Sequence, residues 1–164
     1  MTSTFNHKVF CRQAFIGGNY ALLNTTSFIP NPDYYGALLW HRLMGKHVLS
    51  TTRSGSPYLR AYSHCSRKQP GITLLLINMS NSTSFNVSVE NDFNLNPESR
   101  RNLKAVSEGS KQQREEYHLT PKDGNIQSDV LLLNGVPLKL TESLDIPTYG
   151  PKACGSFYPN HCCA

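Results

Sequence analysis

The sequence predicts a mainly β protein, in which an antiparallel β-sandwich follows a single strand–loop–helix unit. Two observations support this prediction. Residues 9–45 hold a short apolar run, a double glycine and an amphipathic helix, which together form the unit from which β/α barrels are built. After residue 46 the hydrophobic period shortens, and about seven short strands follow at intervals of roughly ten residues, as in antiparallel sandwiches.

The first unit begins with the apolar run Val9–Phe15, which predicts a strand. Arg12 and Gln13 interrupt this run and indicate a strand end near a polar site. Gly17-Gly18 predicts a loop after the strand, because paired glycines permit backbone turns that other residues resist. In a β/α barrel, such a loop lies at the end of the molecule that binds ligands.

The spacing then predicts a helix over residues 31–45. Asn31 is a suitable N-cap, Pro32 fits the first helical position, and Asp33 is favourable near the positive end of the helix dipole. Gly45 predicts the C-terminal stop. The apolar face recurs at helical spacing through Tyr35, Leu38, Leu39 and Leu43.

The remaining strands are predicted from short apolar runs between turn residues. They are His47–Thr52, Tyr58–Cys65, Ile72–Met79, Ser84–Glu90, Glu115–Thr120, Val130–Leu133 and Val136–Leu140. The run Ile72–Ile77 is almost wholly apolar, which predicts a central strand buried on both faces. Asn134-Gly135 predicts a hairpin with a type I′ turn.

The composition indicates a polar but foldable chain of 164 residues, enough for one domain, with 38% hydrophobic and 16% charged residues. A net charge of +5 fits either an ordinary basic surface or affinity for a polyanion. The basic stretch Arg100–Arg114 leaves the same two alternatives, a solvated loop or a polyanion-binding patch. No apolar run reaches the length of a membrane span, and residues 1–20 lack the pattern of a secretory signal.

Four sites fit the N-glycosylation pattern and point to a secreted ancestor. They are Asn24, Asn78, Asn81 and Asn86. The five cysteines are odd in number and contain no CxxC pair, so they predict neither a disulfide framework nor a zinc site. His161 beside Cys162-Cys163 makes a poor metal site without a second cluster. We therefore expect no metal and no cofactor.

No catalytic constellation emerges from the residues alone, but several blocks together are specific. Five blocks occur in a fixed order: RQAFIGGNYALL, PNPDYYGALLWHRLMGKHVL, YLRAYSHCS, ITLLLINMSNST and DVLLLNGVPLKL. In sequence and spacing they closely resemble the C-terminal part of plant heparanase-like proteins, which belong to glycoside hydrolase family 79, the endo-β-glucuronidase and heparanase group. The resemblance covers roughly residues 5–148.

The resemblance implies a piece of a two-part architecture. Residues 1–46 are then the end of a truncated (β/α)8 barrel, 47–148 the β-sandwich, and 149–164 an atypical, disordered tail, since the family's last apolar strand is missing. That loss leaves the closure of the sandwich in doubt. With the barrel absent as well, we expect nothing to cover the apolar face of the helix.

The family's chemistry is retaining hydrolysis of β-glucuronides by two glutamates about 5 Å apart. Both lie upstream of this segment in the family, so no catalytic residue carries over and the chain is expected to be inactive alone. Gly18 and Tyr20 match the GNY motif that contacts the uronic acid; Gly17 matches less securely. The implied partners are a glucuronic-acid-containing glycan and the missing barrel portion, with no nucleic acid.

By resemblance, the parent proteins are secreted, extracellular or lysosomal–vacuolar, with peripheral membrane association as a further expectation. One alternative of a different class stays open. The sandwich, the basic stretch and the positive charge also fit a non-enzymatic carbohydrate-binding or interaction module.

Overall fold

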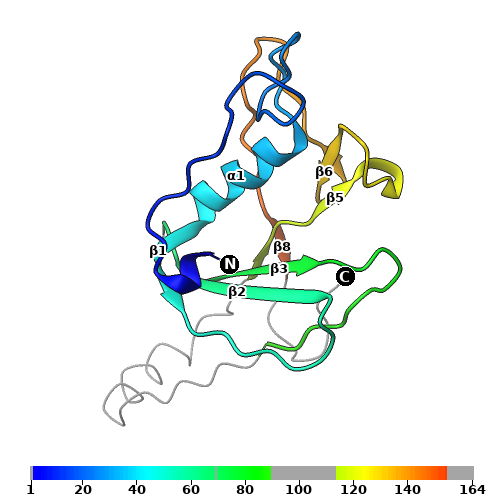
Figure 1. Ribbon diagram of the computed structural model, residues 1–164. Coiled ribbons are helices and arrows are strands. Elements are labelled where there is room, and N and C mark those ends of the chain that lie inside the picture. Colours follow the sequence, from blue (N-terminus) through cyan, green and yellow to red (C-terminus); the bar gives the residue numbers. More distant parts are fainter. Residues whose placement is uncertain (1, 69, 90–113, 155–164) are drawn as a thin grey trace.

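A computed structural model describes residues 2–68, 70–89 and 114–154 of the chain. This part consists mainly of strands with one α-helix, its sheets are all antiparallel, and it contains no closed barrel (Figure 1). The prediction of a mainly antiparallel β protein is therefore confirmed. The sandwich, the barrel remnant and the division into three segments stay predictions.

The helix α1 spans Pro32–Leu43, with Asn31 at the N-cap and proline at the first position, as predicted. The predicted stop at Gly45 is wrong, because no left-handed residue ends this helix. The chain instead passes directly into a strand, and the Met44 N–H caps the helix by bonding to the Trp40 carbonyl. The Leu43 carbonyl accepts bonds from Arg67 N at 3.0 Å and from the hydroxyl of Thr73 at 3.1 Å.

The largest sheet has the order β1-β2-β3, with β1 over Met44–Leu49, β2 over Leu59–Ser66 and β3 over Ile72–Asn78. The sequence places β2 and β3 correctly, and β1 begins three residues before its predicted start. The expectation that Ile72–Ile77 is central and buried is wrong. Among the described residues, β3 pairs only with β2, so it is an edge strand with no buried residue.

Two predicted strands are absent where the structure describes them. Val9–Phe15 forms none, and only its last two carbonyls accept backbone bonds, from Leu22 N and Leu23 N. A strand needs a neighbour to satisfy its N–H and C=O groups, and this part of the chain supplies no neighbour there. Residues 84–89 likewise form no strand, although Phe85 and Val87 are half-buried while Asn86 is exposed.

The rest of the described chain forms two small sheets and two single-turn helices. One sheet contains β5 (Leu119–Pro121), β6 (Leu131–Leu133) and β7 (Val136–Pro137), and the other pairs β4 (Arg114–Glu116) with β8 (Lys152–Cys154). The single turns are η1 (Thr2–Phe5) and η2 (Lys122–Gly124). Asn134 and Gly135 both have positive φ, 52° and 83°, which confirms the predicted type I′ hairpin turn.

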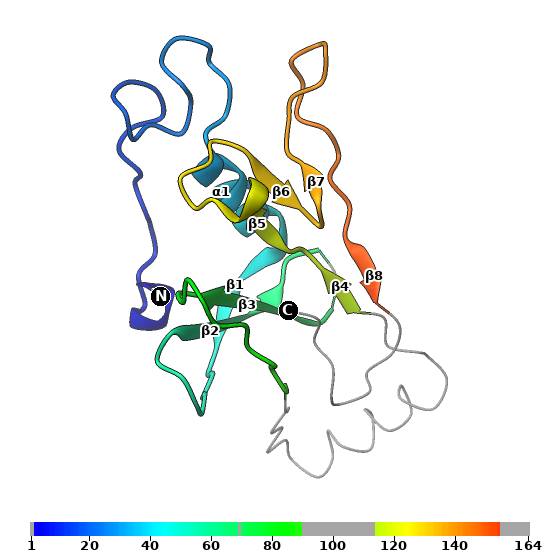
Figure 2. The ribbon, with the colours of Figure 1, turned by 90° about the vertical axis from the view of Figure 1, so that its right-hand side faces the viewer.

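The apolar face of α1 is covered, contrary to expectation. Tyr35 is buried in one cluster with Leu133 and Leu138 from the β6–β7 region. Partly buried side chains surround the cluster: Tyr34, Leu38, Leu39, Tyr117, Leu131 and Tyr149. Figure 2 shows the β5–β6 hairpin lying against α1, with the segment leading to β8 beside it. The helix is therefore covered by strands that follow it in sequence.

Tyr149 is the residue that ties the C-terminal segment to this core. Its ring meets Tyr35 edge-on at 6.2 Å, and its hydroxyl accepts a bond from Lys139 N at 2.9 Å and donates one to Lys139 O at 2.7 Å. Residues 152–154 then pair with β4. The expectation that no strand follows Pro147 is therefore wrong at these residues; residues 155–164 lie outside the described part.

This tyrosine cluster predicts a loss of stability at alkaline pH. Burial, with Tyr149 and Tyr34 nearby, raises the pKa of Tyr35 to about 12, and burial also raises the pKa of Tyr117 and Tyr149. An unfolded tyrosine ionises near pH 10, so the stabilisation is complete below about pH 10 and is lost as pH rises towards about 12. We expect a loss on the order of 1–3 kcal/mol over that range.

Chemical denaturation at several pH values measures this effect. The Tyr35→Phe variant keeps the ring and removes the ionising group, so its stability should fall less steeply over the same pH range. Equal slopes for the two proteins would contradict the assignment to Tyr35.

Candidate functional site

The double-glycine loop is built by backbone geometry that requires glycine. Gly17 and Gly18 have φ values of +108° and +72°, in the region that side-chain-bearing residues avoid. Beyond them the chain folds back, with Leu23 N bonding to Phe15 O at 3.0 Å and Asn31 N bonding to Leu22 O at 2.9 Å. The loop is thus closed on itself next to the start of α1.

In Gly18 and Tyr20, the two residues predicted to contact substrate, the tyrosine ring faces the side of the glycine that bears no side chain. A Cβ atom added to Gly18 would lie 3.3 Å from Cε1 of the Tyr20 ring. The ring therefore rests close to the glycine backbone, and Tyr20 remains 57% exposed. An exposed phenol beside bare backbone offers a ring face and a hydroxyl to a sugar. A Cβ at Gly17 would contact nothing within 4 Å.

Arg12 fixes this loop against the helix. Its Nη2 donates to the Tyr20 carbonyl at 2.7 Å and also forms an ion pair with Asp33 in the first turn of α1. The Asn31 side chain adds a second link, because its Nδ2 donates to the Ala21 carbonyl at 2.7 Å. Sequence reasoning associated Arg12 with a polar site but did not find its link to Tyr20; the signal was a charge inside an apolar run.

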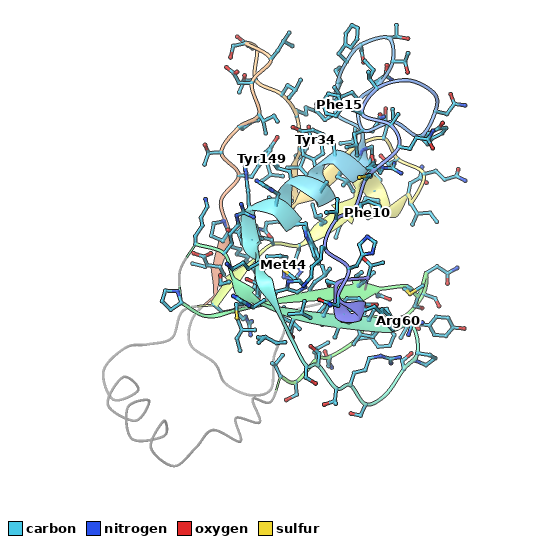
Figure 3. All side chains as sticks on the ribbon, turned by 60° about the vertical axis from the view of Figure 1, so that its left-hand side comes forward. Phe10, Phe15, Tyr34, Met44, Arg60 and Tyr149 are labelled. Carbon is cyan, nitrogen blue, oxygen red and sulfur yellow. The ribbon has the colours of Figure 1, made fainter. Side chains whose placement is uncertain are left out.

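Large apolar side chains are exposed around the same loop. Figure 3 shows Phe15 near the loop and Phe10 lower on the segment that leads to it, beside α1, and they are 60% and 75% exposed. Other exposed apolar residues of the loop are Ile16, Phe28 and Ile29. A gathering of this kind marks an interaction surface more often than a solvent-facing one.

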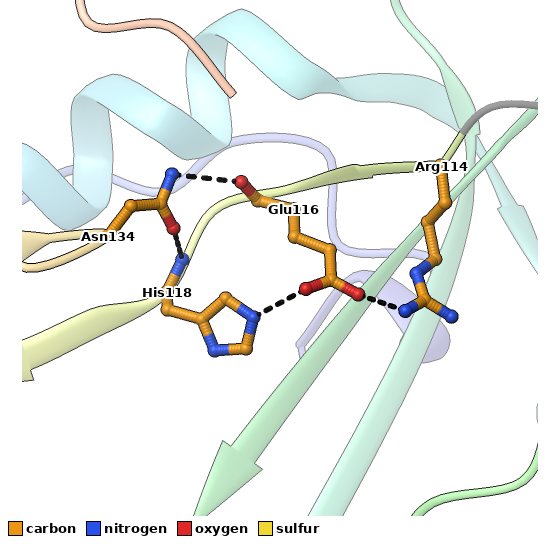
Figure 4. Close-up of polar contacts among 4 residues, drawn as sticks. All are labelled: Arg114, Glu116, His118 and Asn134. Carbon is orange, nitrogen blue, oxygen red and sulfur yellow. Dashed lines mark hydrogen bonds and ion pairs between the residues drawn. The ribbon is translucent and has the colours of Figure 1, made fainter. Parts of the chain in front are cut away.

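A separate polar cluster lies where β4, β5 and the β6–β7 turn meet (Figure 4). The Glu116 carboxylate forms an ion pair with Arg114 and lies 2.9 Å from His118 Nε2. Asn134 Oδ1 accepts from His118 N at 2.9 Å, and its Nδ2 donates to the Glu116 carbonyl at 3.1 Å. These contacts link neighbouring strands and bring no second carboxylate to Glu116, so the cluster fits a structural role.

The Asn134 side chain thus has a role beyond the turn, which sequence reasoning missed because the turn pattern alone explained the residue. Of the basic stretch Arg100–Arg114, only Arg114 is described, and it is paired with Glu116. Both alternatives for the rest of that stretch concern residues outside the described part.

The four glycosylation candidates are all exposed: Asn24, Asn78, Asn81 and Asn86. Asn24 accepts bonds from Thr26 N and Ser27 N within its own turn. The Asn78 amide donates to Thr83 O at 2.8 Å and accepts from Ser80 N at 2.8 Å. Exposure makes each position accessible, and occupancy stays a prediction.

The described residues gather no group of three His, Cys, Asp or Glu side chains that would hold a metal ion. Over the same residues, no helix has the length and apolarity to cross a bilayer.

Comparison with known proteins gives consistent matches along most of the chain. It is 49% identical over 166 aligned residues to "Heparanase-like protein 1" of Arabidopsis thaliana, covering 92% of this chain and 31% of that protein. The chain is 47% identical over 144 residues to "Baicalin-beta-D-glucuronidase" of Scutellaria baicalensis, and the match covers 88% of this chain and 24% of that protein. A "Hyaluronoglucuronidase" of Hirudo nipponia matches at 29% identity over 169 residues, covering 96% and 33%.

No protein-family model matches the chain. The chain spans about a third or less of the length of these curated relatives.

Proposed function

We propose that this chain, which belongs to the heparanase-like proteins over the third of their length that it covers, contributes a sugar-binding loop to a β-glucuronide hydrolase. The observation that carries the proposal is the position of the Tyr20 ring beside the Gly18 backbone, within a segment 47% identical to a β-glucuronidase. The bare backbone at Gly18 lets an N–H approach a carboxylate, and the Tyr20 phenol supplies a hydrogen bond and a ring face.

The chain on its own is then a binding element without its catalytic pair. Retaining hydrolysis needs two carboxylates about 5 Å apart, one acting as acid/base and the other as nucleophile. Among the described residues, the printed contacts that position Tyr20 involve one carboxylate, that of Asp33, and Arg12 already forms an ion pair with it. We expect no turnover of a fluorogenic β-glucuronide by the purified chain; turnover above the blank would contradict this part of the proposal.

A graft tests the role of the loop directly. We would replace the matching segment of baicalin-β-D-glucuronidase by this chain and measure baicalin hydrolysis. Tyr20→Ala in the graft is expected to raise KM by about tenfold, because it removes contacts worth about 1.4 kcal/mol. Tyr20→Phe keeps the ring and removes only the hydroxyl, so its KM should rise less than that of Tyr20→Ala.

Tyr58→Ala is the matched control for the graft, since Tyr58 is equally exposed at 59% and lies outside the loop. Its KM should stay within about twofold of the unmodified graft. If Tyr20→Ala and Tyr58→Ala behave alike in an active graft, the loop does not bind the sugar.

We further propose that the missing portion of the parent is the natural cover for the loop. The exposed Phe10 and Phe15, and the absence of a strand at residues 9–15, both fit a segment that would pair with neighbouring barrel strands. In that setting the segment is the last strand of the barrel, and the strands after α1 belong to the sandwich. Co-expression with the upstream part of a relative should yield a complex, and its absence would contradict this assignment.

Secretion, with glycans at the four candidate sites, belongs to the same proposal and concerns the whole parent protein. Expression of the chain behind a secretory signal, followed by enzymatic removal of N-glycans, measures occupancy as a shift in mass. A chain recovered from the medium with no shift would contradict glycosylation.

A non-enzymatic glycan-binding role is the second candidate, favoured by a different observation. A hollow lined by four Lys and Arg side chains contains neither Gly18 nor Tyr20 in its lining.

A further inference from the structure

A shallow hollow of about 780 Å³ lies between the N-terminal segment, β1 and β2. Its walls come from residues 3–8, from β1 with the loop after it, and from the first half of β2. Figure 1 shows η1 beside these two strands, and Figure 3 places Arg60 on the same side of the sheet. None of the residues predicted to contact the sugar lines it.

The lining is strongly basic. Lys8, Lys46, Arg53 and Arg60 contribute four permanent positive charges, and no Asp or Glu of the described chain lines the hollow. Across the described ranges, none of the four forms an ion pair with a carboxylate. Like charges held together without counter-charges repel one another, and a bound polyanion would relieve that repulsion.

The N-terminal wall of the hollow is attached to the sheet. His64 is buried, and its Nδ1 lies 2.8 Å from the Gly45 carbonyl, so Nδ1 carries the proton and donates to it. Its Nε2 is then the acceptor for the Ser3 hydroxyl at 3.2 Å. Arg53 is also positioned, because its Nη1 donates to the Ser56 carbonyl at 2.9 Å. Two walls therefore have defined positions before any ligand arrives.

The remaining lining favours a sugar chain over other polyanions. Hydroxyl and amide side chains lie between the cations: Ser3, Thr4, Asn6, Ser50 and Thr51. These groups can bond to sugar hydroxyls, whereas single-stranded nucleic acid is held by several stacked aromatic rings. Tyr62 and the imidazole of His47 are the aromatic rings among the lining residues, and only Tyr62 is a large one.

We propose that this hollow is a second glycan site, which binds an acidic, uronic-acid-containing oligosaccharide through Lys8, Lys46, Arg53 and Arg60. The choice of a uronic acid rests on the proposed function, while the choice of a polyanion rests on the hollow itself. Such a site would hold a stretch of an acidic polysaccharide independently of the Gly18–Tyr20 loop.

The test measures binding of short hyaluronan oligosaccharides to the full chain by calorimetry at about 50 mM salt. The variant Lys8→Gln/Lys46→Gln/Arg60→Gln removes three lining charges and should weaken binding by about tenfold or more. The matched control Lys122→Gln/Lys139→Gln/Lys152→Gln removes the same charge from outside the hollow and should weaken it less than about threefold. Cooperative thermal unfolding of each variant shows that it is folded.

Each further outcome decides the proposal. Binding of hyaluronan but not of an uncharged chitin oligosaccharide, lost at high salt and weakened by the lining variant more than by its control, supports a site in the hollow whatever becomes of the loop. No hyaluronan binding at low salt, or equal weakening by both triple variants, overturns the site. Tighter binding of single-stranded DNA of equal charge overturns the assignment to a glycan.

Discussion

Replacing Tyr35 by alanine is expected to lower the free energy of unfolding by about 3–5 kcal/mol, the range for truncating a buried aromatic side chain. Tyr35 is 4% exposed and lies at the centre of the cluster that joins α1 to Leu133 and Leu138. Its ring also meets Tyr34 at 5.8 Å and Tyr149 at 6.2 Å, both edge-on. Edge-to-face ring pairs add about 0.5–1.5 kcal/mol each beyond the buried area.

The consequence is large because Tyr35 is one of three buried residues in the cluster that joins the helix to the later strands. A small domain is stable by about 5–15 kcal/mol, so the loss removes a large share of the total. Since Tyr35 connects the helix to both the β6–β7 hairpin and the segment leading to β8, its removal should loosen all three at once.

Urea denaturation followed by circular dichroism measures the effect. Tyr58→Ala is the matched control, because the same atoms are removed from a side chain that is 59% exposed, and it should change stability by less than about 0.5 kcal/mol. Tyr35→Phe retains the ring, so its loss of stability should lie between those of Tyr35→Ala and Tyr58→Ala. Similar midpoints for Tyr35→Ala and Tyr58→Ala would show that the cluster does not support the fold.

What could be predicted from the sequence was local. The start of α1 follows from Pro32 and Asp33, which act within one helical turn, whereas Asn31 occupies the N-cap position without making a side-chain capping bond. The β6–β7 turn follows from Asn134-Gly135, whose positive φ values are set by the two residues themselves. In both cases the stabilising groups are within a few residues of each other, so the pattern is sufficient.

What could not be predicted depends on partners distant in sequence. An apolar run becomes a strand only beside a neighbour, so Val9–Phe15 remains irregular and β3 lies at an edge despite its composition. Tyr149 looked like part of a tail because its partner Tyr35 lies more than a hundred residues earlier. No local sequence pattern predicts such a contact.

The candidate site shows the same division. The motif identified Gly18 and Tyr20 through resemblance, and the structure adds that the Tyr20 ring lies beside the Gly18 backbone. No motif indicated that Arg12 links Tyr20 to Asp33. The cations of the hollow, Lys8, Lys46, Arg53 and Arg60, come from four separate segments. Charges scattered along a sequence reveal a site only after the chain has brought them together.

Replacing Gly45 by alanine is expected to cost about 3 kcal/mol, at the upper end for overpacking, although the change adds one methyl group. A Cβ at this position would lie 2.4 Å from the Cys65 carbonyl oxygen and 3.1 Å from that of Ser66. Both atoms belong to the backbone of β2, which cannot move aside as a flexible side chain would. The strands β1 and β2 must therefore separate where their register already shifts, between Met44 and Val48.

Gly36→Ala is the matched control and should have the opposite sign. Gly36 lies inside α1, where an added Cβ would meet nothing within 4 Å, so alanine should stabilise the helix by up to about 1 kcal/mol. Thermal or urea unfolding of both variants measures the difference. A Gly45→Ala protein as stable as the Gly36→Ala protein would mean that β1 and β2 are not in this close contact.

The Gly45 substitution also reaches the basic hollow, because the carbonyl of Gly45 is the group that holds His64, and His64 holds Ser3. Moving β1 away from β2 should release this chain of contacts and loosen the N-terminal wall, which includes Lys8. We therefore expect Gly45→Ala to weaken hyaluronan binding under conditions where the variant is still folded, and Gly36→Ala to leave it unchanged. A folded Gly45→Ala protein with unaltered binding would show that the attached wall is not needed by the site.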